Sequence, residues 1–153
     1  MKVRKRINSH EDTHKLAKII SEDIFPGMII GLSGDLGSGK TTFTKYLAKE
    51  IGVKDNLNSP TFTILKTYKG DIDLYHMDVY RLEDIGYDYE LDDYIYGRGI
   101  AIIEWCEYIN MMLPKDILKI SFKFIDETTR DVIIEGSGEY EKIVEKISHR
   151  YSD

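Results

Sequence analysis

The residues best suited to chemistry form one glycine-rich stretch, Gly34-Asp35-Leu36-Gly37-Ser38-Gly39-Lys40-Thr41. It satisfies the pattern G-x-x-x-x-G-K-[ST], the phosphate-binding loop (P-loop) of nucleotide hydrolases and kinases. Its glycines allow backbone conformations in which successive N–H groups turn inward around a β-phosphate. Lys40 would reach the β- and γ-phosphate oxygens, and the Thr41 hydroxyl would ligate Mg²⁺. The stretch therefore predicts a site for a nucleoside triphosphate.

The segments on either side of this loop are those that the motif requires. Residues 28–32 (MIIGL) form an apolar run typical of a buried strand, and residues 42–50 have helical character. The positive end of that helix would add to the attraction for phosphate. The alternative is a glycine-rich turn that matches the pattern by chance, and the strand and helix around it argue against that alternative.

Hydrolysis or transfer of a phosphoryl group also needs a carboxylate near the Mg²⁺, and two are suitably placed. Glu104 ends the continuous apolar run 100–103, which is typical of a strand buried on both faces. Asp78 ends the strand-like run 72–78. Because ligand groups of α/β sheets gather at the carboxyl ends of strands, either carboxylate could coordinate the ion or its water. The alternatives are that Asp78 only caps the next segment and that Glu104 is an exposed strand end.

Three other side chains are open to a structural or a functional interpretation. His76 could orient water or sense the γ-phosphate, although a histidine on a half-apolar strand is more often a packed residue. Trp105 belongs either to the core or to a cover over the nucleotide. Cys106 has no neighbouring histidine or basic residue to activate it, so we interpret it as structural.

Composition limits the class of protein. A chain of 153 residues, with 42% hydrophobic and 31% charged residues, predicts a single domain over residues 1–153. The single cysteine favours a reducing, cytoplasmic location, and no apolar run is long enough to cross a membrane. The net charge of −6 argues against a protein that holds nucleic acid by itself. If a nucleic acid is involved, we expect a partner to carry most of its phosphate contacts.

The remaining elements are predicted from periodicity and from cap and turn signals. Residues 3–7 alternate between apolar and basic side chains, and we interpret them as an edge strand with a solvated basic face rather than a contact for phosphate or RNA. The other expected elements are a helix capped by Ser9 and reaching about Glu22, a hairpin of strands 61–68 and 72–78, helical patches at 82–85 and 89–94, a hairpin of strands 117–125 and 130–135, and a closing helix at 139–149.

Four segments taken together resemble the TsaE family (also called YjeE), the small ATPase of bacterial tRNA threonylcarbamoyladenosine synthesis. The matching sequences are G-D-L-G-S-G-K-T-T at 34–42, S-P-T-F-T at 59–63, H-M-D-V-Y-R-L at 76–82 and I-E-W at 103–105. Their order and spacing extend over residues 13–114, and the last hairpin and helix match only loosely. The loop alone indicates a nucleotide hydrolase, whereas the combination is far more specific.

The resemblance implies a P-loop NTPase-like α/β fold of three layers, with a central, mostly parallel sheet of mixed edges flanked by helices. It implies ATP or ADP and Mg²⁺ as ligands, and it suggests that residues 59–62 and 76–81 are switch segments. Lys40, Asp78 and Glu104 are the expected catalytic residues, and Thr41, Asp78 and Glu104 the expected Mg²⁺ positions. The expected nucleotide-binding residues are Thr13, near the base, and Asp35, Leu36, Gly37, Ser38, Gly39, Lys40, Thr41 and Thr42.

The family works with TsaB and TsaD, and TsaD transfers threonylcarbamoyl to adenosine 37 of ANN-decoding tRNAs. The resemblance therefore implies TsaB and TsaD homologues as partners, contact with tRNA only through them, and an ATPase that resets the complex. The chain lacks an obvious arginine finger near the P-loop, and without one intrinsic hydrolysis should be slow. Arg81 is the candidate within the same chain, and otherwise a partner must complete the site. A small-molecule kinase and a binding switch with negligible turnover remain as alternatives, and the motifs do not distinguish adenine from guanine.

Overall fold

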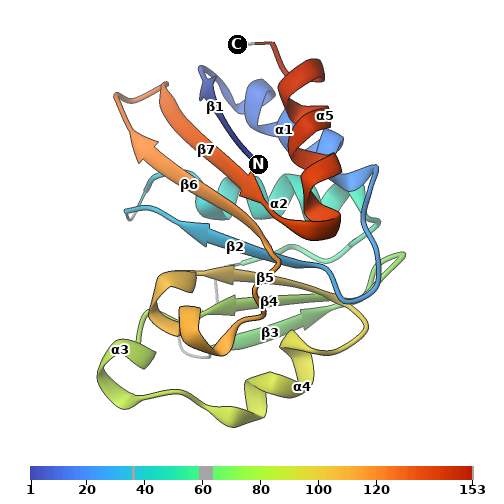
Figure 1. Cartoon of the computed structure of the whole chain (residues 1–153), viewed down its shortest axis with the longest axis vertical. Helices are drawn as coiled ribbons and strands as arrows, with labels where there is room; N and C mark the ends of the chain where they lie inside the picture. The colour runs from blue at the N-terminus through green and yellow to red at the C-terminus, as the bar shows by residue number, and fades with distance from the viewer. Residues whose placement is uncertain (36, 59–63, 153) are drawn as a thin grey trace.

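The computed structural model describes residues 1–35, 37–58 and 64–152. Within them, seven strands form one sheet in the order β1-β7-β6-β2-β5-β4-β3 (Figure 1). The central strands β6, β2, β5 and β4 are parallel, whereas β3, β7 and β1 are antiparallel to their neighbours. This confirms the predicted mostly parallel sheet with mixed edges. The strands are β1 (Lys2–Ile7), β2 (Ile29–Ser33), β3 (Leu65–Tyr68), β4 (Leu74–Asp78), β5 (Ile100–Glu104), β6 (Leu118–Phe124) and β7 (Arg130–Gly136).

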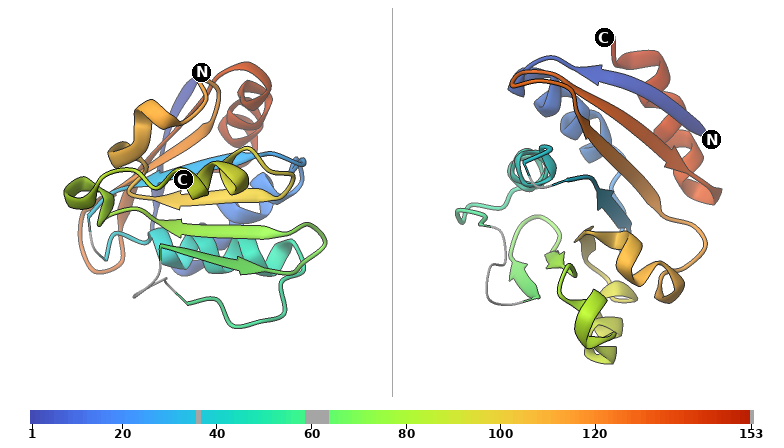
Figure 2. Two further views of the ribbon diagram at one scale, coloured as in Figure 1. Left: turned by 90° about the horizontal axis from the view of Figure 1, so that it is seen from below. Right: turned by 90° about the vertical axis from the view of Figure 1, so that its left-hand side faces the viewer.

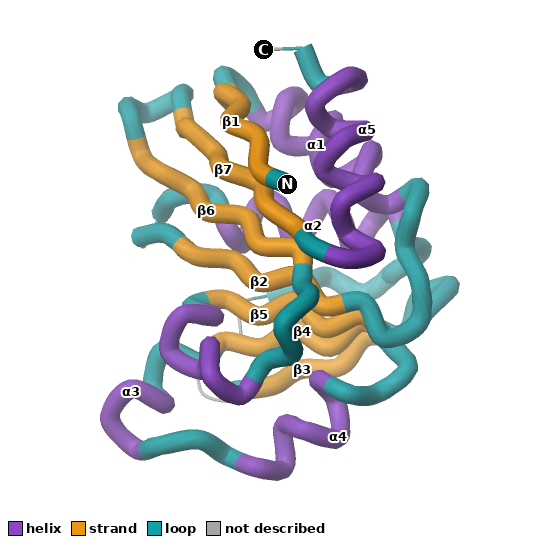
Figure 3. Tube along the Cα trace, in the orientation of Figure 1, coloured by secondary structure: helices purple, strands orange, loops and turns teal. Residues whose placement is uncertain are grey.

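Helices cover both faces of the sheet, which gives three layers (Figures 2 and 3). The longer helices α1 (His10–Ser21), α2 (Lys40–Glu50) and α5 (Glu141–Arg150) pack on one face. The other face carries the short helices α3 (Leu82–Ile85) and α4 (Asp92–Ile95) and the 3₁₀ segments η1 (Tyr89–Leu91) and η2 (Cys106–Met112). A further 3₁₀ turn, η3 (Gly138–Tyr140), leads into α5.

The central strands contribute to two separate hydrophobic cores because successive side chains of a strand point to opposite faces. In β5, Ile100 and Ile102 pack beneath the longer helices, and Ala101 and Ile103 pack beneath the short ones. All five residues of β5 and of β2 are buried, as predicted for strands covered on both sides. These two strands are therefore held rigidly, and each ends at the same edge of the sheet.

Most predicted elements occur within a few residues of their expected bounds. Ser9 caps α1, and its hydroxyl accepts a hydrogen bond of 3.2 Å from the Asp12 N–H. The prediction of a strand over 61–68 is wrong at Ile64, which lies in a bend before β3, and residues 61–63 lie outside the described residues. The predicted closing helix is also shorter, because 138–140 form the 3₁₀ turn η3 before α5 begins.

The conformation of the P-loop leads to a first prediction. Gly34 has φ +135°, and a Cβ added there would lie 2.4 Å from the Phe122 carbonyl oxygen in β6. Gly37 has φ +77°, but among the described residues beyond its chain neighbours no atom lies within 4 Å of a Cβ added there. We expect Gly34→Ala to lower the free energy of unfolding by about 2–4 kcal/mol, from clash and backbone strain together. The matched variant Gly37→Ala should cost only about 1 kcal/mol, from strain alone.

Denaturant unfolding of the nucleotide-free protein measures both losses. Equal losses in the two variants would show that the close approach of Gly34 to β6 does not constrain the loop.

Candidate nucleotide-binding site

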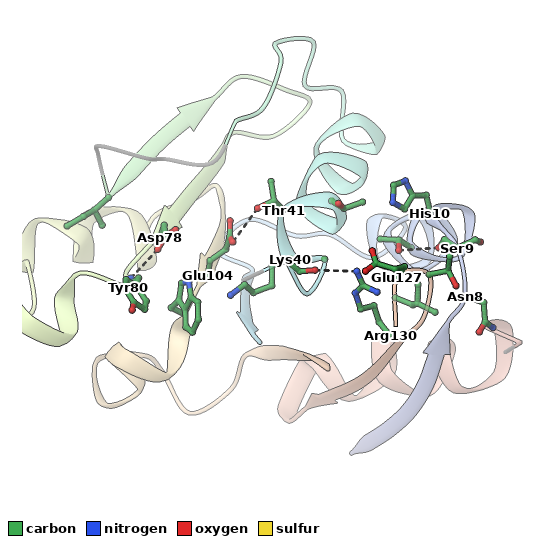
Figure 4. A pocket seen from close by; sticks show the side chains of 18 of the residues that line it. Asn8, Ser9, His10, Lys40, Thr41, Asp78, Tyr80, Glu104, Glu127 and Arg130 are labelled. Carbon is green, nitrogen blue, oxygen red and sulfur yellow. Dashed lines mark hydrogen bonds between the residues drawn. The ribbon is translucent and has the colours of Figure 1, made fainter. Parts of the chain in front are cut away.

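A cavity of about 950 Å³ opens at the carboxyl ends of the parallel strands (Figure 4). Side chains of α2, β4 and β5 form one end of it, and the start of α1 and the turn between β6 and β7 (residues 125–129) form the other. The structure brings most of the predicted site residues to its walls. These are Thr13, Gly37, Gly39, Lys40, Thr41, Thr42, Asp78 and Glu104.

Of the other predicted loop contacts, two described residues do not line this cavity, and a third lies outside the described part of the chain. Leu36 lies outside the described residues, as does the whole of the expected first switch at 59–62. Asp35 does not line the cavity, and its carbonyl accepts a hydrogen bond of 3.0 Å from the Ser38 N–H. Ser38 is almost completely buried behind the loop, and its hydroxyl has no hydrogen-bond partner within the described part of the chain. Asp35 and Ser38 therefore shape the loop through their backbones here.

Lys40 lies at the first position of α2, directly after Gly39, which caps the helix with φ +111°. Its side chain is 5% exposed, and its ammonium donates a hydrogen bond to the Gly34 carbonyl. The same nitrogen lies 3.5 Å from the centre of the Trp105 ring, a cation–π contact. Burial lowers the pKa of Lys40, and the nearby charge of Glu104 opposes that shift. The result is a desolvated cation at the start of a helix, where an anion is favoured.

Glu104 is held at the centre of the site by contacts on both carboxylate oxygens. Its Oε1 lies 3.5 Å from the Thr41 hydroxyl, and its Oε2 lies 2.6 Å from His76 Nε2. Glu104 is 3% exposed and His76 is completely buried, so the interpretation of Glu104 as an exposed strand end is wrong. The interpretation of His76 as a packed residue is confirmed. Its hydrogen-bond partner is the carboxylate of Glu104.

Asp78 lies beside Glu104 because β4 and β5 pair in parallel with these two residues in register. Its Oδ1 accepts a hydrogen bond of 3.1 Å from the Tyr80 N–H, so Asp78 does cap the following segment. It also lines the cavity, so capping and lining occur together. Burial raises the pKa of Asp78, its bond from the Tyr80 N–H opposes the shift, and the neighbouring charge of Glu104 adds to it.

These oxygens fit a Mg²⁺ ion. Thr41, Asp78 and Glu104 offer a hydroxyl and carboxylates, which are the hard donors that Mg²⁺ prefers. The described residues contain no group of three or more His, Cys, Asp or Glu side chains that could hold a metal by themselves. Such a sparse set suits an ion that takes its other ligands from phosphate and water.

Trp105 forms a wall of the cavity, and it reaches that position through an unusual backbone. Among the described non-glycine residues it alone has a positive φ, +63°. Its ring lies 4.9 Å from that of Tyr80 and stacks on Tyr108 at 5.8 Å. Its neighbour Cys106 is buried, and burial raises the pKa of that thiol to about 11, so it is protonated at neutral pH. The structural interpretation of Cys106 agrees with this environment.

The end of the cavity away from Asp78 and Glu104 contains Thr13, the expected contact near the base, together with residues that no motif singled out. Thr13 is 5% exposed in the first turn of α1, and Asn8, Ser9 and His10 precede it along the wall. Glu127, Thr128 and Arg130 approach from the β6–β7 strands and turn. No local pattern marks them, because only the tertiary fold brings this turn beside the loop. Arg81 also lines the cavity, and its role as an arginine finger stays a prediction.

The parallel sheet, the glycine loop at the end of β2 and the helix that follows it define a P-loop NTPase-like α/β protein. Comparison with known proteins narrows this class. The family model for "Threonylcarbamoyl adenosine biosynthesis protein TsaE" matches residues 7–132. The chain belongs to the TsaE family.

Individual relatives agree with this assignment. The chain is 43% identical over 140 residues to the tRNA threonylcarbamoyladenosine biosynthesis protein TsaE of Bacillus subtilis, covering 90% of this chain and 89% of the relative. It is 40% identical over 131 residues to the protein of that name from Aquifex aeolicus, covering 84% and 92%. A crystal structure of Bacillus subtilis YdiB matches with a TM-score of 0.83 at 34% identity, covering 99% and 97%.

The raised pKa of Asp78 leads to a prediction about pH. Because the pKa is higher in the folded than in the unfolded chain, stability falls as the pH rises from the ordinary value of 3.8 through the folded value. We therefore expect Asp78→Asn to be more stable than the wild type at pH 7 without nucleotide. The difference should disappear below about pH 4, where both forms of the side chain are neutral. Thermal unfolding of both proteins at several pH values measures this difference in stability. A difference that does not change with pH would show that it does not come from ionisation of Asp78.

Proposed function

We propose that this protein binds and hydrolyses ATP with Mg²⁺, and that it serves the threonylcarbamoyl modification of adenosine 37 in ANN-decoding tRNAs. It acts in the cytoplasm with homologues of TsaB and TsaD, as an ATPase that resets or assembles their complex. The observation that carries the proposal is the convergence of Lys40, Thr41 and Glu104 in one cavity of a TsaE-family chain. The names of its relatives supply the connection to tRNA threonylcarbamoyladenosine.

The residues at the phosphate end of the cavity would have different roles, which follow from their positions. The first N–H groups of α2 and the Lys40 ammonium would hold the β- and γ-phosphates. Thr41, Asp78 and Glu104 would hold Mg²⁺, which neutralises charge on the phosphates when bound. His76 fixes the rotamer of Glu104, so this carboxylate is already oriented when nucleotide enters. Glu104 or Asp78 would orient or deprotonate the attacking water.

The charge distribution supports a role through partners. The segment 80–96 holds six acidic residues and one arginine, which gives −5 of the net charge of −6. This segment borders the phosphate end of the cavity through Tyr80 and Arg81. A surface of this sign repels RNA phosphates, so the tRNA would be held by a partner protein. Arg81 is the only arginine of this segment, in keeping with slow turnover when the protein is alone.

Phosphate release from ATP, measured with and without the TsaB and TsaD homologues, tests the proposal. We expect slow release by the protein alone and a clear increase with the partners. Binding without any release in either case would favour the binding switch, and phosphorylation of a small metabolite would favour a kinase.

Lys40→Ala tests the loop itself. Removing a charged phosphate contact should cost on the order of 2–4 kcal/mol of binding or of transition-state stabilisation. Calorimetric titration with ADP and measurement of turnover both report it. Lys45→Ala is the matched control, because Lys45 is an exposed residue of the same helix. Near-normal affinity and turnover in Lys40→Ala would show that this loop is not the phosphate-binding loop.

Glu104→Gln separates binding from hydrolysis. The amide keeps the shape of the side chain and can still bond to His76, but it loses the charge. We expect ATP binding to survive and turnover to fall on the order of 100-fold, the scale of a positioned acid–base group. If turnover is unchanged, we assign the positioning of the attacking water to Asp78. In that case Asp78→Asn should show the fall in turnover instead.

A further inference from the structure

We propose that Arg130 is a positioning residue of the phosphate-binding loop. It holds the Gly37 and Ser38 carbonyls toward its own guanidinium, so that the Gly39 N–H is turned to the phosphates before nucleotide arrives. This inference rests on the proposed function, because it assigns Arg130 to the same nucleotide site. Arg130 begins β7 and reaches the loop from the β6–β7 turn (Figure 4).

The guanidinium of Arg130 connects two separate stretches of backbone. On the loop side, its Nε donates to the Ser38 carbonyl at 3.0 Å and its Nη2 donates to the Gly37 carbonyl at 3.3 Å. On the turn side, its Nη1 donates to the carbonyls of Asp126 at 2.5 Å and Thr129 at 3.0 Å. The Phe124 ring lies beneath it, 4.6 Å from Cζ. A planar fork of donors fits this set of acceptors, and a lysine ammonium does not.

The bonds to the loop fix the direction of its peptide groups. In a trans peptide the C=O and N–H point to opposite sides, and the described residues contain no cis bond. With the Ser38 carbonyl directed toward Arg130, the Gly39 N–H must point the other way. Gly39 caps α2 and lines the cavity, so this N–H is directed to where a phosphate would bind. The Gly37–Ser38 peptide is fixed as well, but its N–H donates to the Asp35 carbonyl at 3.0 Å and so serves the loop itself rather than a phosphate.

Such a constraint matters because glycines give the middle of the loop a choice of backbone conformations. Gly37 and Gly39 both have positive φ, and glycine has access to conformations on either side of φ zero. A peptide that flipped would turn a carbonyl oxygen toward the phosphates, where it repels them. Restricting the loop beforehand lowers the entropy that binding must overcome.

A simpler alternative is that Arg130 attracts nucleotide only through its charge. Its donors already bond to backbone carbonyls on both sides, which argues for geometry instead. Arg130→Lys distinguishes the two, because lysine keeps the charge and cannot form the fork. Arg130→Gln removes both the positive charge and the planar fork of donors. Lys123→Gln is the matched control, since it removes the same charge from an exposed position of the same hairpin.

We expect Arg130→Lys and Arg130→Gln each to weaken Mg²⁺-ADP binding about tenfold, as the loss of charge-assisted hydrogen bonds implies. Lys123→Gln should stay within twofold of the wild type. In turnover, KM should rise while kcat changes little, because bound nucleotide orders the loop. Calorimetry and steady-state kinetics provide these values, and thermal unfolding without nucleotide shows whether each variant is folded.

Wild-type affinity in Arg130→Lys would overturn the inference, because charge alone would then suffice. An equal loss in Lys123→Gln would overturn it too. If the Arg130 variants do not fold, Phe124→Leu provides the test, since it removes only the ring under the guanidinium; a two- to threefold loss of affinity supports the inference, and no loss overturns it. Failure of the wild type to bind ADP would instead reject the proposed function.

Discussion

The in-register parallel pairing of β2, β5 and β4 is the constraint on which the site depends. Hydrogen bonds along these strands place Leu32, Glu104 and Asp78 side by side. The P-loop begins directly after β2. The loop and both carboxylates therefore lie at one edge of the sheet, independently of the conformation of the surrounding loops. Burial on both faces keeps these strands from shifting, because a slip of one residue would exchange the side chains of the two cores. The geometry of the chemical groups is therefore a property of the sheet.

The contact between His76 and Glu104 shows how the fold tolerates a carboxylate in its interior. A buried charge without a partner is costly, and Glu104 has a close one at 2.6 Å together with the Thr41 hydroxyl. His76 comes from β4, the strand that also supplies Asp78, so one strand provides both a candidate ligand and the support for another. Within the described residues His76 Nδ1 has no hydrogen-bond partner. The imidazole in this position therefore makes a hydrogen bond to the described residues through Nε2 alone.

The sequence predicted those features that local pattern determines. The loop motif, the apolar runs of β2 and β5 and the cap at Ser9 each follow from residues adjacent in the chain, and Glu104 and Asp78 follow from their positions at strand ends. Arg130 could not be found in this way, because nothing within its own segment indicates that the β6–β7 turn lies beside the loop. Likewise, the bonding of His76 to Glu104 depends on strand pairing over 28 positions. Three-dimensional contacts of this kind leave no periodic signal.

The left-handed backbone at Trp105 has a consequence for how this protein can change. A side chain at that φ costs about 1–3 kcal/mol relative to a relaxed conformation, and a glycine would avoid most of it. The fold nevertheless places its largest side chain there, directly after Glu104, and the ring lies over Lys40. Replacing Trp105 by glycine would relieve the backbone, but it would also remove the ring that lies over Lys40 and packs on Tyr80 and Tyr108. A relaxed backbone and an aromatic wall for the cavity are therefore alternatives at this one position of the chain.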